Sequence, residues 1–300
     1  MSESDEIQNA IRILEGDEDH RVLRRISSSQ SWDLPQAESQ VRHGLFVDVE
    51  TTGLDTETDE IIEVALLPFD YDPKTGSIVA VHEGTALNEL RDPGIPIPAE
   101  SSQIHGITEE QVRGKTVDEA RVKSLVDEAD LIIAHNSAFD RPMLERVWPC
   151  FVTKPWACSL VDVDWRAEGF GAGKLDYLLM QQGWFYDGHR ALSDCLAGVF
   201  LLSCNLPTSG MIGMNALLQS ARIKRFSVRA IGAPFESKDD LRKRGYRWDP
   251  GNEGREKAWW TIVEHPDAEL EWLHQNIFHS EVDLPVKAIT AMDRFSVRGI

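Results

Sequence analysis

The sequence has few features of a secreted or membrane-bound protein. Its four cysteines, Cys150, Cys158, Cys195 and Cys204, form no Cys-x-x-Cys pair and no cluster with histidine. The sequence therefore predicts neither a disulfide framework nor a zinc site. No apolar run reaches the length of a membrane span, and the first six residues are acidic where a signal peptide would be basic. We expect a cytoplasmic protein with no membrane partner.

Positive charge is also scarce. The chain has 31 Lys and Arg against 50 Asp and Glu, for a formal net charge of −19. This balance argues against a protein that coats nucleic acid with a basic surface, but it allows an enzyme that holds a few phosphates through metal ions. The 300 residues, 42% of them hydrophobic, suffice for one good-sized domain and a smaller one, and make wholesale disorder improbable.

One stretch, 45–53, organises the rest of the chain. Its apolar start predicts a buried strand, and the strand ends in Asp48-Val49-Glu50 followed by two threonines and a glycine. Alternate residues of a strand share a face, so Asp48 and Glu50 point to the same place. Two carboxylates that close raise each other's pKa unless a cation lies between them, and hard oxygen ligands suit Mg²⁺ or Mn²⁺. The same pattern also fits a solvated strand end that leads into a turn.

The segments around this stretch predict an antiparallel meander followed by alternating strands and helices. Strands are expected at 43–48, 61–67, 77–81, 131–134 and 156–160. Helices are expected after the N-cap Thr108, at 116–129, after 140, at 174–179 and at 189–202. This order indicates an α/β or α+β sheet with helices packed on it.

The pattern divides the chain into four parts. We expect a helical arm at 1–40 that packs on the main domain, with helices at 7–14 and 22–26; a main domain at 41–205; a linker at 206–220; and a small domain at 221–300. Residues 221–249 hold nine Lys and Arg against four Asp and Glu, with aromatic residues between them. The pentapeptide at 225–229 recurs at 294–298, which two neighbouring strands of one small sheet would explain.

Four acids and one histidine form the candidate catalytic set: Asp48, Glu50, Asp140, His189 and Asp194. The segments 48–53, 135–140 and 189–194 that contain them resemble the three exonuclease motifs of the DnaQ-like DEDDh family of 3′–5′ exonucleases. The Ile-His-Gly-Ile-Thr segment typical of that family is present at 104–108. The resemblance covers about residues 43–204. It implies an α/β fold with a ribonuclease H-like mixed sheet and flanking helices, to which a small C-terminal α+β domain is added.

The resemblance also implies roles for single residues. The four acids would hold two ions, Mg²⁺ or Mn²⁺, about 4 Å apart, and His189 would take a proton from the attacking water. Six residues would contact the terminal nucleotide or support the site: Thr51, Thr52, Gly53, Leu54, Asn136 and Phe139. Packing in the core is an equally good reading of Phe139. We expect His105 to be structural or on the rim of the pocket, and Asp55, Asp59 and Glu63 to be ordinary acids.

The sequence thus predicts a metal-dependent 3′–5′ exonuclease that releases nucleoside monophosphates from single-stranded or frayed 3′ ends of DNA, in proofreading or repair. Two alternatives remain: an exoribonuclease that trims RNA ends, and a catalytically vestigial subunit that binds nucleic acid or associates with a DNA polymerase. The tail at 238–260 has a short similarity to the HARP-type module. Its basic and aromatic residues can contact phosphates and bases, or its tryptophans can form a core. We expect deletion of 211–300 to weaken DNA binding and to spare the chemistry on short substrates.

Overall fold

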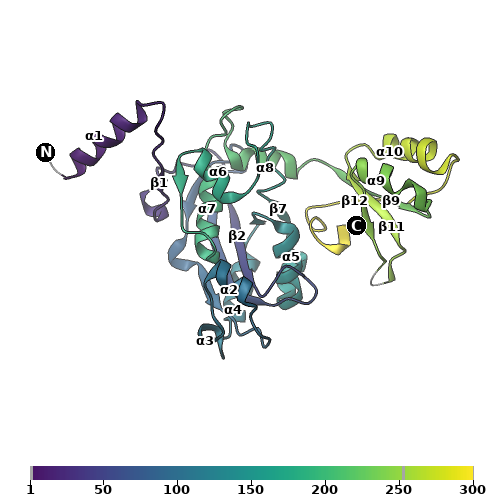
Figure 1. Cartoon of the computed structure of the whole chain (residues 1–300), viewed down its shortest axis with the longest axis horizontal. Helices are drawn as coiled ribbons and strands as arrows, with labels where there is room; N and C mark the ends of the chain where they lie inside the picture. Colours follow the sequence, from purple (N-terminus) through teal and green to yellow (C-terminus); the bar gives the residue numbers. More distant parts are fainter. Residues whose placement is uncertain (1–2, 252–253, 300) are drawn as a thin grey trace.

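The structure is a computed structural model that describes residues 3–251 and 254–299. Its centre is a six-stranded sheet of order β4-β3-β2-β6-β7, with β5 paired to β3 (Figure 1). β2 runs antiparallel to β3 and parallel to β6, so the sheet is mixed, as predicted. The strands are β2 Arg42–Thr51, β3 Ile61–Tyr71, β4 Ile78–Val81, β5 Leu87–Leu90, β6 Leu131–Ala134 and β7 Trp156–Cys158.

Helices cover both faces of this sheet. The helices in chain order are α2 Ala99–His105, α3 Glu109–Val112, α4 Glu119–Glu128, α5 Ser137–Val147, α6 Leu175–Gln181, α7 Ala191–Ser203 and α8 Gly213–Ala221. Alternate residues of β2 enter different cores: Phe46 packs with residues of α6, α7 and α8, whereas Leu45 and Val47 pack with residues of α4 and α5. Because strand residues alternate, Asp48 lies on the same face of β2 as Phe46.

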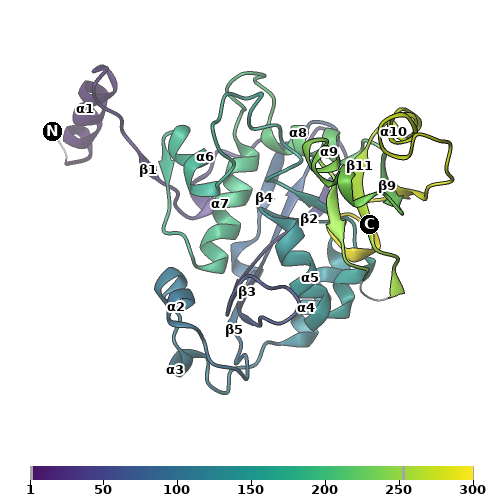
Figure 2. The ribbon, with the colours of Figure 1, turned by 45° about the vertical axis from the view of Figure 1, so that its right-hand side comes forward.

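The N-terminal arm packs on the main domain only through its second half. α1, Glu3–Glu15, stands away from the rest of the molecule in both views (Figures 1 and 2), and its Ile7 and Ile13 are 53% and 65% exposed. Where a second helix was expected, the two-residue strand β1, Arg24–Arg25, pairs with β8, Trp184–Phe185. The helix expected at 7–14 is present within α1, whereas the second expected helix is replaced by the pairing of β1 with β8; Ile26, Trp32 and Leu34 pack on the core of the main domain.

The segment expected as a linker is part of the main core. Residues 213–221 form α8, whose Met214 and Leu217 are fully buried against α7 and the sheet. Pro207, Ser209 and Gly210 produce only the turn that precedes this helix. The change in composition marked a turn, and the apolar side chains after it extend the fold of the main domain.

The last quarter of the chain builds a four-stranded antiparallel sheet of order β10-β11-β9-β12. Its strands are β9 Arg225–Ile231, β10 Arg247–Asp249, β11 Ala258–Val263 and β12 Val286–Ile289, and its helices are α9 Lys238–Lys243 and α10 Pro266–Leu273. Its core contains Val228, Trp259 and Leu273, while Trp248 is 51% exposed. We call residues 225–289 the C-terminal module.

The repeated pentapeptide does not form two paired strands. Its first copy is most of β9, but its second copy, 294–298, leads into a 3₁₀ turn at Val297–Gly299. Phe295 has a φ of 62°, a left-handed conformation that interrupts an extended strand. Among the described residues, no helix is both long enough and apolar enough to span a membrane.

Candidate active site

A glycine on α7 brings one strand and one helix of the site into close contact. A Cβ atom at Gly198 would lie 2.1 Å from the ring of Phe46, so only glycine lets α7 approach β2 this closely. Asp194 lies one helical turn before Gly198, and Asp48 lies two residues after Phe46 on the same face of β2. The contact between Gly198 and Phe46 therefore sets the separation of the two acids.

Three of the predicted acids converge at this point. Asp48, Glu50 and Asp194 each place a carboxylate oxygen within 4.8 Å of the others. Asp140, on α5, is 4% exposed, and its negative charge acts on Asp48. The structure therefore brings together all four acids from three different elements of the fold.

The pKa values of these acids show that the cluster is short of positive charge. Burial, and then repulsion from Asp140, Asp194 and Glu50, raises the pKa of Asp48 well above its usual value. Burial and the neighbouring acids raise the pKa of Glu50 to about 8, and burial raises that of Asp140 to about 7. A partly buried group of hard oxygen ligands with this excess of negative charge fits a divalent cation such as Mg²⁺ or Mn²⁺.

Tyr186 holds Asp194 in place and was not identified from the sequence. Its hydroxyl donates a 2.8 Å hydrogen bond to Asp194 Oδ1, and the Arg190 amide donates one of 3.1 Å to Oδ2. Burial and the charge of Asp194 raise the pKa of the Tyr186 phenol, so it remains a donor. No sequence pattern indicates this role, because Tyr186 precedes the motif at 189–194 in an irregular segment.

Glu63 is a second residue that the sequence interpretation missed. It is 1% exposed and lies opposite Glu50 in the pairing of β2 with β3. Arg190 neutralises it with hydrogen bonds of 2.8 and 3.1 Å from its guanidinium, and the Ala191 amide donates another of 3.1 Å. The expectation of an ordinary acid was wrong: Glu63 anchors the start of α7. The strand register could have indicated it, since it places Glu63 beside Glu50.

His189 lies in the loop before α7 and not in the helix. The expected helix start at 189 is two residues too early, because α7 begins at Ala191. His189 is exposed and has a φ of 63°, a strained conformation that is uncommon for residues other than glycine. Burial raises the pKa of Asp194, and the hydrogen bond from Tyr186 and the nearby His189 oppose part of this rise, which places the imidazole beside the acid cluster.

The loop after β2 is stabilised by its own side chains. Thr51 donates a 2.6 Å hydrogen bond to the Gly53 carbonyl, and Thr52 donates one of 2.8 Å to Asp59. A Cβ at Gly53 would lie 2.4 Å from the Asp59 carboxylate, so this glycine makes room for Asp59. The two threonine hydroxyls thus shape the loop, and Asp59 is part of its scaffold. Leu54 is 87% exposed at its tip, where a base could contact it.

The other candidate residues lie around the cluster in different environments. Asn136 is exposed at the N-cap of α5, and Phe139 is partly buried against the core shared by α4 and α5. The environment of Phe139 fits the core-packing interpretation. His105 is buried, and its Nδ1 accepts a 3.0 Å hydrogen bond from the Ile107 amide, which indicates a structural role.

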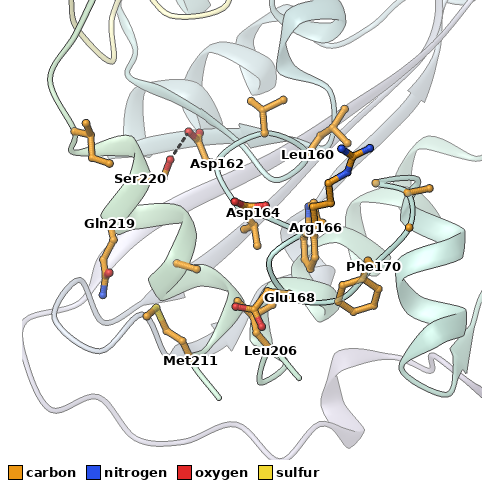
Figure 3. Close-up of a pocket in the computed structure, with 18 of the residues that line it drawn as sticks. Leu160, Asp162, Asp164, Arg166, Glu168, Phe170, Leu206, Met211, Gln219 and Ser220 are labelled. Atoms are coloured by element: carbon orange, nitrogen blue, oxygen red, sulfur yellow. Dashed lines mark hydrogen bonds between the residues drawn. The ribbon is translucent and has the colours of Figure 1, made fainter. Parts of the chain in front are cut away.

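A large pocket lies elsewhere on the main domain. It has a volume of about 1000 Å³ and is lined by the segment 160–173, by Leu206 and by residues of α8 (Figure 3). Asp162 and Ser220 are joined by a 3.3 Å hydrogen bond at one side of it.

Comparisons with known proteins match the main domain. A family model described as an exonuclease, of the RNase T type, matches residues 45–202. An uncharacterized exonuclease, CP81, of Escherichia phage 186 is 33% identical over 173 residues, which are 50% of this chain and 81% of that protein. A DNA polymerase III subunit epsilon-like protein of Rhodobacter capsulatus is 37% identical over 102 residues, 33% of this chain and 14% of that protein.

Two further likenesses concern a much larger enzyme and solved structures. A PolC-type DNA polymerase III of Thermotoga petrophila is 34% identical over 152 residues, 48% of this chain but only 9% of the polymerase. The structure of Exonuclease X in complex with 5′ overhanging duplex DNA has a TM-score of 0.40 and 24% identity, covering 57% of this chain and 99% of that one. The crystal structure of E. coli Exonuclease I in complex with a dA16 oligonucleotide has a TM-score of 0.47 and 15% identity. The match covers 74% of this chain and 63% of that one.

Proposed function

The chain belongs to the exonuclease family whose model matches residues 45–202, and from this premise we propose that it removes nucleotides from the 3′ ends of DNA. The observation that carries the proposal is the convergence of Asp48, Glu50 and Asp194 within 4.8 Å, with Asp140 buried beside them. The predictions of a nuclease fold and of a nuclease enzyme are confirmed by the family match. The 3′–5′ direction of digestion, and the residues that contact the terminal nucleotide, are part of the proposal.

The four acids would hold two divalent ions. We expect the loss of Asp48 to weaken ion binding the most, because its charge interacts with those of the other three acids. Such ions, when bound, activate a water molecule and neutralise charge on the phosphate and the leaving oxygen. The raised pKa values of Glu50 and Asp140 support this assignment, because each acid needs a nearby positive charge to be ionised at neutral pH.

His189 would accept a proton from the attacking water. Imidazole is the most frequent general base in enzymes, and the exposed loop position of His189 lets it reach a substrate at the cluster. Arg190 and Glu63 fix this loop from one side. Tyr186 fixes Asp194 from the other. The residues around His189 are therefore arranged to hold it at the edge of the acid cluster.

DNA is the favoured substrate because one similar protein is named as a PolC-type DNA polymerase III and another as a DNA polymerase III subunit epsilon-like protein. The same names support a role in proofreading and an association with a polymerase. The acid cluster and the exposed tip at Leu54 suit a single-stranded or frayed end, whose last base is free to unstack.

The test is a parallel digestion with Mg²⁺ of three 5′-labelled substrates: single-stranded DNA, duplex DNA with a mismatched 3′ end, and RNA of the same sequence. The proposal predicts stepwise shortening of both DNA substrates with retention of the label, and slower shortening of RNA. The Asp48→Asn variant should produce no shortening. Cleavage that releases the 5′ label first, or equal cleavage by Asp48→Asn, would refute the proposal. Faster cleavage of RNA would favour the ribonuclease alternative.

A further inference from the structure

The last described residues return from the C-terminal module to the main domain. We call residues 291–298 the C-terminal strap. In both ribbon views the chain end lies between the small sheet and α5 (Figures 1 and 2). The Trp156 amide of β7 donates a 2.8 Å hydrogen bond to the Ala291 carbonyl, and Phe295 packs against the core under α4 and α5. The strap thus contacts both the edge strand β7 and the helix that carries Asp140.

Arg141 is the centre of this contact. Its side chain is fully buried, at 0% exposure. Its guanidinium donates hydrogen bonds of 2.5 Å to the Arg294 carbonyl and 2.7 Å to the Met292 carbonyl, and its Nε donates one of 2.7 Å to Glu145. It also lies 5.4 Å from the ring centre of Trp156. A buried guanidinium without acceptors is strongly destabilised, so the strap carbonyls are a structural requirement of α5.

Two arginines of the strap add ion pairs with the main domain. Arg298 donates two hydrogen bonds, of 2.8 and 2.6 Å, to the carboxylate of Glu145, one turn along α5 from Arg141. Arg294 pairs with Asp162, the fully buried acid seen at the pocket in Figure 3. Asp162 in turn accepts a 2.8 Å hydrogen bond from the Cys158 amide at the end of β7. The strap therefore holds α5 at Arg141 and Glu145, and it holds the segment after β7 at Asp162.

We propose that the C-terminal strap positions Asp140 for metal binding, acting through Arg141 and Glu145. Arg141 directly follows Asp140 on α5, so any shift of the helix that frees the guanidinium also moves the carboxylate. The inference rests on the proposed role of Asp140 at the active site. It also changes the expectation for a deletion of 211–300, because that deletion removes the strap and should impair the chemistry as well as DNA binding.

The chain offers a matched control for this idea. The strap pairs Arg298–Glu145 and Arg294–Asp162 have side-chain exposures of 34%/10% and 10%/0%. The pairs Arg244–Glu269 and Arg229–Asp249, which lie within the C-terminal module, have exposures of 37%/9% and 11%/3%. The double variant R294A/R298A and the control R229A/R244A therefore remove arginines of nearly the same burial, but only the first pair joins the strap to the main domain.

The experiment measures two quantities on the full chain: Mn²⁺ affinity by electron paramagnetic resonance, and kcat and KM on a short oligonucleotide. Since a displacement of ~1 Å in a site can lower turnover up to about 100-fold, we expect R294A/R298A to lose roughly 10-fold in kcat with little change in KM. Its Mn²⁺ affinity should fall several-fold. The control should keep both values within about twofold of the wild type. The single variant R298A should show a smaller loss in the same direction, and R298K should restore part of it.

Equal values for the strap variant and the wild type would overturn the inference. So would equal losses in the strap variant and the control, because they would show a general loss of stability. If the double variant does not fold, the comparison of R298A with R244A decides in the same way. If the wild type cuts no DNA, the proposed function fails, while the Mn²⁺ affinities still test the strap.

Discussion

Replacing Glu50 by glutamine should stabilise the metal-free protein while abolishing its activity. The pKa of Glu50 is raised from 4.5 to about 8 by burial and by the neighbouring acids. The folded protein therefore keeps a proton on Glu50 at pH values where the unfolded chain has lost it. The free energy of unfolding therefore falls as the pH rises from about 4.5 to about 8. In this range the folded state binds more protons than the unfolded state, so a lower proton concentration favours unfolding.

The size of this effect follows from the pKa values. One pKa unit corresponds to about 1.4 kcal/mol, so the full rise would cost about 5 kcal/mol at pH 8. Solvent screening at the partly open site reduces this cost, and we expect about 2 kcal/mol. For a domain of this size, that stabilisation raises the melting temperature by roughly 4–8 °C. Glutamine keeps the shape of glutamate and removes only its charge.

The assay is thermal melting in EDTA at pH 8 and pH 5. Glu50→Gln should melt several degrees above the wild type at pH 8 and close to it at pH 5, where Glu50 is protonated in the folded protein. Glu57→Gln, in the exposed turn after the same strand, is the matched control and should not change either value. Mg²⁺ should raise the melting temperature of the wild type more than that of Glu50→Gln. A Glu50→Gln protein that melts below the wild type at pH 8 would refute the reasoning.

Four further predictions concern the groups around the cluster. Chelation should abolish activity, and Mg²⁺ or Mn²⁺ should restore it; full activity after exhaustive dialysis against EDTA would contradict this. Tyr186→Phe removes one hydrogen bond to Asp194 and should cost about 1 kcal/mol in kcat/KM, or roughly fivefold. Glu63→Gln should lower kcat at least tenfold by releasing Arg190 and the loop of His189; unchanged kinetics would remove it from the site. Gly198→Ala should destabilise the protein by about 1–3 kcal/mol and reduce Mn²⁺ affinity, because its Cβ would meet Phe46.

Local patterns in the sequence encode part of the site and of the sheet, whereas the full set of four acids and the mixed sheet were predicted from the resemblance to the DEDDh exonucleases. Alternation within 45–50 places Asp48 and Glu50 on one face, and the apolar run at 131–134 marks a buried strand. The family match at 45–202 covers nearly the stretch assigned by resemblance. The roles of individual site residues stay predictions.

What could not be predicted depends on contacts between distant segments. Glu63 joins the site through its register opposite Glu50 and through Arg190, 127 residues later in the chain. The attachment of the strap depends on hydrogen bonds from Arg141 to the carbonyls of Met292 and Arg294, which are 151 and 153 residues later in the chain. The repeated pentapeptide has one sequence and two conformations, because one copy pairs in a sheet and the other binds α5. Local propensity is the same in both copies, so tertiary contacts decide the outcome.

The most direct test of the account is the anomalous difference map of crystals soaked in Mn²⁺ and a nucleoside monophosphate. The account predicts manganese peaks bound by Asp48 and shared with Glu50, Asp140 and Asp194. Absence of any peak among these four residues, or carboxylates turned too far apart to share an ion, would contradict it.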